Sequence, residues 1–86
     1  MDNLSEADKR SIAVFAVYTS RIFWDQMNLE RHGDLKMIYP MVMKSEASRE
    51  YLSSELSKAL GNEKLEYNLF RFRRNMSELE LECLKS

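Results

Sequence analysis

The chain has 86 residues, of which 44% are hydrophobic and 31% charged, and its formal net charge is −1. This length and balance predict one domain, residues 1–86, and exclude collagen-like, disulfide-framed and strongly disordered chains. Two glycines and one proline leave little material for the turns of a many-stranded β-fold, so we expect a mostly helical protein.

The first predicted helix covers residues 6–32. Ser5, followed by Asp8 three positions later, is typical of a helix N-terminus, where short side chains accept free backbone N–H groups. Apolar residues recur every three to four positions from Ile12 onward, and Gly33 is a favourable C-terminal stop. A strand here is the competing interpretation, because Val, Ile and aromatic residues favour strands. The alanines and the capping pattern favour the helix.

Two shorter helices are predicted next. Asp34 can cap a helix over residues 35–44, in which Pro40 either introduces a kink or opens a new helix at its first turn. Ser45 can cap a third helix over residues 46–60, whose apolar residues form one stripe.

The last predicted helix covers residues 63–84. Its apolar residues follow the 4-3-4-3-4 spacing of a coiled-coil seam. A β-hairpin over residues 65–84 is the alternative, but its turn would lack glycine, and an isolated hairpin is marginally stable in water. The four segments together predict a small all-α bundle of three to four helices, with a dimer as the expected assembly. The predicted coiled-coil seam of the last helix, residues 63–84, consists of Leu65, Leu69, Phe72, Met76, Leu79 and Cys83.

The sequence offers little for catalysis or metal binding. His32 and Cys83 are the only histidine and cysteine, and neither phosphate-binding glycine motif is present. We therefore expect no metal, no cofactor and no enzymatic activity. A single cysteine without a disulfide framework indicates a reducing compartment, and the longest apolar runs are too short to span a bilayer. The expected location is the cytoplasm, without membrane association.

The segment Ile12–Tyr18 is apolar on every side of a helix. A chain this short cannot easily cover such a helix all round, so burial against a partner is expected. This favours a small intracellular protein-interaction module of the adaptor or inhibitor type, with a second copy of itself and an unidentified protein as partners. A homodimer is the commonest solution of this kind. The predicted interface residues are Val14, Val17, Tyr18, Arg21, Phe23, Trp24 and Tyr39.

An alternative function is binding of phosphate-containing ligands, either nucleotides or nucleic acid. Arginine side chains suit phosphate and aromatic rings can stack on bases, and the two types alternate near residue 72. The acidic residues at 78, 80 and 82 can neutralise this cluster, and the net charge of −1 argues against bulk nucleic-acid binding. The candidate residues are Tyr67, Phe70, Arg71, Arg73 and Arg74.

Overall fold

Four α-helices and one short 3-10 turn make up most of residues 4–85, which the computed structural model describes. No strand occurs in this range, and none of its helices is long and apolar enough to cross a membrane. The molecule is flat, with principal extents of 36 × 35 × 18 Å. The elements are α1 (Glu6–Arg21), η1 (Trp24–Gln26), α2 (Leu29–Lys44), α3 (Glu46–Leu60) and α4 (Leu65–Lys85).

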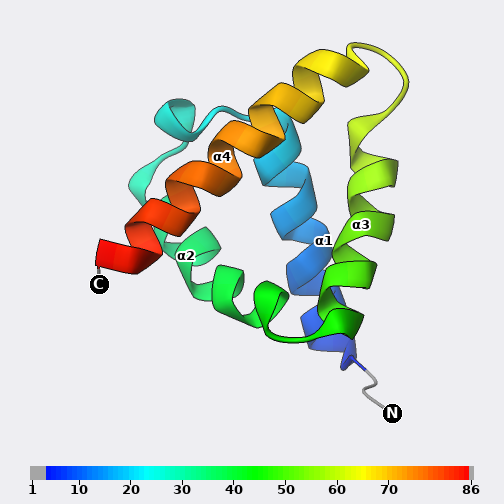
Figure 1. Ribbon diagram of the computed structural model, residues 1–86, viewed down its shortest axis with the longest axis vertical. Helices are drawn as coiled ribbons and strands as arrows, with labels where there is room; N and C mark the ends of the chain where they lie inside the picture. The colour runs from blue at the N-terminus through cyan, green and yellow to red at the C-terminus, as the bar shows by residue number, and fades with distance from the viewer. Residues whose placement is uncertain (1–3, 86) are drawn as a thin grey trace.

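Helix α1 lies at the centre of the arrangement (Figure 1). Helix α3 runs beside it, and α4 crosses the C-terminal half of α1 and then reaches the middle of α2. The core therefore forms where α1 meets the other helices, and its centre is a set of side chains with almost no exposed surface. The fully buried apolar residues are Ile12, Phe15, Ala16, Leu35, Val42 and Leu79.

Three helices begin with a side-chain cap. The side-chain oxygens of Ser5, Asn28 and Ser45 each accept a hydrogen bond from the backbone N–H three residues later, at 3.0, 2.8 and 3.1 Å. The predicted caps at Ser5 and Ser45 are thus confirmed, and the helix predicted over residues 46–60 has those bounds. The predicted cap at Asp34 is wrong, because this residue lies inside α2.

The predicted first helix, over residues 6–32, is too long. Helix α1 ends at Arg21, and the chain continues in an extended conformation at Ile22 before η1. The helical spacing of buried apolar residues does not continue to Leu29, which is 84% exposed, although Met27 after η1 still packs into the core. The second helix begins at Leu29 instead of residue 35, so Gly33 is an interior residue of α2 and not a stop.

The end of α1 is held by a buried amide side chain of the neighbouring helix α4. Asn75 of α4 is fully buried, and its Nδ2 donates to the carbonyl oxygens of Thr19 and Ile22 at 2.9 and 2.7 Å. Its Oδ1 accepts the backbone N–H of Trp24 at 2.7 Å. The bond to Thr19 replaces a helical hydrogen bond that α1 loses where it stops, and the other two hold the segment that follows.

Pro40 lies inside α2, four residues before its end. The proline ring has no N–H to offer to the carbonyl group of Lys36, so α2 lacks one helical hydrogen bond there. The predicted helix over residues 35–44 is therefore part of a longer helix that continues through the proline.

Residues 65–85 form one continuous helix, and the alternative β-hairpin over residues 65–84 is not supported. Leu79, near the C-terminal end of the predicted seam, is fully buried, and most other seam residues are half-buried. Leu65 is the exception, because it is exposed at the start of α4.

The two glycines predict opposite responses to the same substitution. A Cβ at Gly33 would meet no atom within 4 Å, so Gly33→Ala is expected to raise the free energy of unfolding by about 0.5–1 kcal/mol. Gly61 ends α3 with φ +67° and ψ 179°, a backbone conformation that side chains strongly disfavour. Gly61→Ala is therefore expected to lower the same quantity by about 1–3 kcal/mol. Urea unfolding followed by circular dichroism measures both, and a stabilised Gly61 variant would contradict this account of the turn.

Candidate functional site

Within residues 4–85, the outer face of α1 is only partly covered by other parts of the fold. Val14 is 46% exposed and Val17 is 43% exposed, whereas Phe15 and Ala16 between them are fully buried. The apolar segment at residues 12–18 therefore divides into a side that forms the core and a side that faces outward. This outward side is the start of the candidate site.

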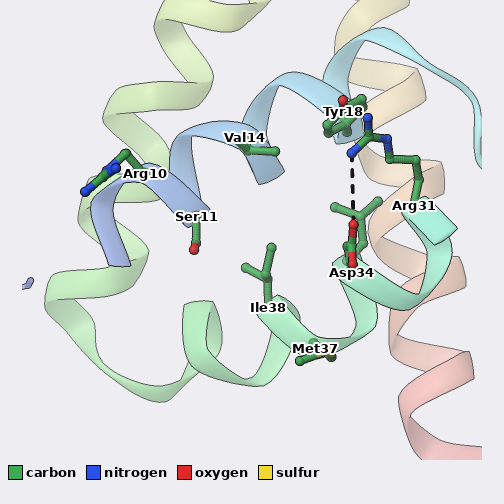
Figure 2. Close-up of a pocket in the computed structure, with 9 residues that line it drawn as sticks. Arg10, Ser11, Val14, Tyr18, Arg31, Asp34, Met37 and Ile38 are labelled. Carbon is green, nitrogen blue, oxygen red and sulfur yellow. Dashed lines mark ion pairs between the residues drawn. The ribbon is translucent and has the colours of Figure 1, made fainter. Parts of the chain in front are cut away.

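A groove runs between this face of α1 and helix α2 (Figure 2). We call it the α1–α2 groove; its cavity has a volume of about 280 Å³. Leu35 is buried within it, and Ile38 of α2 points toward the space between the helices. A second hollow over Ala13, Val14, Val17 and Tyr18 adjoins it. The lining of the groove comprises Arg10, Ser11, Val14, Tyr18, Arg31, Asp34, Leu35, Met37 and Ile38.

Charged groups stand at the edge of this apolar surface. The guanidinium carbon of Arg31 lies 4.6 Å from the centre of the Tyr18 ring, and the same side chain is 4.0 Å from the carboxylate of Asp34. Arg10 lines the other end of the groove, and no carboxylate pairs with it within residues 4–85. Met37 stands beside them with 80% of its surface exposed. The groove thus combines an apolar interior with a rim that carries both signs of charge.

The structure places three of the predicted interface residues, Val14, Val17 and Tyr18, on this surface. The others lie elsewhere. Trp24 is half-buried and stacks on the ring of His32, with centroids 4.0 Å apart and planes 6° apart. His32 Nε2 lies 2.7 Å from the Trp24 carbonyl oxygen, which can only accept, so this nitrogen carries a hydrogen. Trp24 is thereby partly covered by the chain itself.

Tyr39 is also half-buried, on the side of α2 that faces the C-terminal half of α4. Burial raises the pKa of its hydroxyl above the usual 10.0, and the negative charges of Glu80 and Cys83 add to the shift. The structure does not bring this residue together with the exposed valines of α1.

Arg21 and Phe23 belong to a separate region at the C-terminal end of α1. Phe23 packs edge-to-face against Tyr67 and Phe70, with ring centroids 5.7 and 6.3 Å apart. The guanidinium carbon of Arg71 lies 5.1 Å from the Phe23 ring centre and 4.7 Å from that of Tyr67. Arg74 also lies over Phe23, at 5.7 Å. We call Phe23, Tyr67, Phe70, Arg71 and Arg74 the arginine–aromatic cluster.

Four of the five predicted anionic-ligand residues therefore come together. Arg73 is the exception, because it is exposed and makes no ring contact among the described residues. None of the five ion pairs within residues 4–85 involves Arg71, Arg73 or Arg74, so the acidic residues that follow do not neutralise the cluster by direct pairing.

Metal-binding groups do not gather anywhere in the described range. No three His, Cys, Asp or Glu side chains of residues 4–85 lie close enough together to hold a metal ion. Cys83 is half-buried in the seam of α4 and forms no disulfide.

Sequence reasoning missed Arg10, Arg31, Asp34 and Ile38 as members of the groove. Arg31, Asp34 and Ile38 follow helical spacing on one face of α2. That spacing carries information only when a helix runs through Gly33, whereas the local pattern predicts that this glycine ends the helix before it. The signal that could have found them is Asn28 followed by Glu30, a favourable start for a helix.

Two separate surfaces thus stand out, the α1–α2 groove and the region around the arginine–aromatic cluster. They share no residue. No protein-family model, no curated protein and no solved structure matches this chain.

Proposed function

We propose that this protein is an interaction module that binds a second copy of itself through the α1–α2 groove. One observation carries the proposal: Val14, Val17 and Met37 are exposed around the apolar α1–α2 groove and the hollow that adjoins it. When a partner covers apolar side chains that are exposed next to a preformed cavity, the burial lowers the free energy of the complex.

The choice of a second copy as the occupant follows from the composition of this surface. Under two-fold symmetry each subunit offers the same patch, so any patch that dimerises must complement itself. The rim supplies cations, Arg10 and Arg31, as well as the carboxylate of Asp34, so two copies can pair opposite charges. Met37 is long and flexible, and it is suited to enter the groove of the other subunit while receiving the same contact in return.

The test is the molecular mass in solution as a function of concentration. Light scattering coupled to size-exclusion chromatography is expected to show a mass that rises from 10.2 kDa toward twice that value. Val17→Glu places a charge in the contact and is expected to weaken self-association by at least about tenfold. A mass of 10.2 kDa that persists at high micromolar concentration would overturn the proposal.

The matched control is Leu84→Glu. Leu84 is 75% exposed near the end of α4 and lines neither cavity of the α1 face. This variant adds the same charge to an exposed apolar position of a helix and is expected to dimerise like the unmodified chain. Equal effects of the two variants would mean that net charge, and not the groove, controls association.

A further inference from the structure

We propose a second binding site, in which the cavity beside Arg21 and Arg71 holds the phosphate group of a nucleotide while the arginine–aromatic cluster stacks its base. The cavity has a volume of about 510 Å³ and lies where the end of α3 and the loop after it approach α1 and α4. The nucleotide can be free or part of a single strand, because both present the same phosphate and base.

Both guanidinium groups are fixed in place by the ends of neighbouring helices. Arg21 Nε donates to the carbonyl oxygen of Ala59 at 3.2 Å, and Arg71 Nη1 donates to that of Ser20 at 3.3 Å. Asn68 Nδ2 binds the next carbonyl oxygen of α3, that of Leu60, at 2.8 Å. These carbonyl groups are therefore already occupied, and the arginines are oriented before any ligand arrives.

The other N–H groups of the two guanidinium groups have no hydrogen-bond acceptor within the described range. The terminal nitrogens of Arg21 and Nη2 of Arg71 make no hydrogen bond there, whereas Arg71 Nε also lacks a partner but is buried out of a ligand's reach. No carboxylate lies within 4.0 Å of either guanidinium in residues 4–85, although Glu63 also lines the cavity. Two fixed cations without a counter-ion are an arrangement that a phosphate group satisfies, whether monoester or diester, through short charge-assisted bonds to its oxygens.

The aromatic rings beside the cavity favour a nucleotide over a simple anion. Arg71 lines the cavity and also lies over Tyr67, so the phosphate site and the cluster are continuous. Phe70 and Tyr67 are exposed, and Phe23 supports both rings from within. An exposed ring held in one orientation next to arginines is the platform on which single-stranded bases stack.

The test is a titration of the full chain, followed by amide shifts in NMR spectra, with inorganic phosphate, adenosine monophosphate and a short oligothymidylate. Shifts are expected around Gly61 and Phe70, and the nucleotide is expected to bind more tightly than phosphate alone. Binding should weaken as salt is added. Tighter binding of the oligonucleotide than of the mononucleotide would identify a single strand as the source, and the reverse would identify a free nucleotide.

Two variants separate the phosphate contact from the stacking contact. Arg21→Gln is expected to weaken binding of all three probes by about tenfold, since it removes a charged donor. Phe70→Ala is expected to weaken nucleotide binding by about tenfold and to leave phosphate binding unchanged. Both residues are exposed, so both variants should keep the circular dichroism spectrum of the unmodified chain.

The matched control is Arg49→Gln. Arg49 is exposed and donates to a helix-end carbonyl oxygen, that of Met43 at 2.9 Å, but it lies outside the cavity. An equal loss of binding in this control, or no saturable shift with any probe, would overturn the proposal. Displacement of the nucleotide by an acidic peptide at lower concentration than by phosphate would overturn it as well, because the site would then select carboxylates.

Discussion

Replacing Asn75 by leucine is expected to lower the free energy of unfolding by about 3–5 kcal/mol. Leucine has nearly the size of the amide, so the loss comes from hydrogen bonds and not from an empty space. The substitution leaves the carbonyl groups of Thr19 and Ile22 and the N–H of Trp24 without their partner. Because Asn75 is fully buried, water cannot replace it without opening the contact between α1 and α4.

Urea unfolding followed by circular dichroism measures this loss, and Asn68→Leu is the control. Asn68 is also an asparagine of α4 that binds the end of a neighbouring helix, but it is only half-buried and its short bond is the single one to Leu60. Its loss is expected to be about 1 kcal/mol. A chain of this size has a total stability of about 5 kcal/mol, so the Asn75 variant is expected to be partly unfolded at room temperature. Equal losses in the two variants would show that Asn75 does not hold the end of α1.

The same bonds explain why the end of α1 could not be predicted from local pattern. The side chains that donate to the last carbonyl groups of this helix, those of Asn75 and Arg71, stand more than 50 positions later in the chain. A pattern read in a window of 15 or so residues contains none of them. Helix α3 is the opposite case, because Ser45 caps it and Gly61 ends it with its own backbone. The residues that set both ends of α3 are therefore its immediate neighbours in the sequence, and the predicted bounds agree with the structure.

The candidate site was predictable to the extent that it lies on one helix. The excess of apolar side chains in α1 indicated that one face would remain uncovered, and Val14 and Val17 are exposed. Which residues face them depends on how α2 packs, and that depends on where α2 begins. Arg21 shows the same limit in the second site, since its neighbour in the cavity is Arg71 of α4.

Two substitutions on α1 are expected to separate stability from association. Phe15→Ala removes a fully buried ring from the centre of the core and is expected to lower the free energy of unfolding by about 3–5 kcal/mol. Val14→Ala, one position away on the exposed face, is expected to change it by less than about 1 kcal/mol. Denaturant unfolding at a protein concentration low enough to keep the chain monomeric measures both values.

Self-association is expected to respond in the reverse order. Val14→Ala removes apolar surface from the α1–α2 groove and should weaken dimer formation several-fold, as measured by light scattering. Phe15→Ala alters no surface residue, so the folded fraction of that variant should associate as the unmodified chain does. If Val14→Ala instead costs as much stability as Phe15→Ala in the monomer, the outer face of α1 is covered within one subunit. The groove would then be part of the core, and the self-association proposed for it would have no surface on which to act.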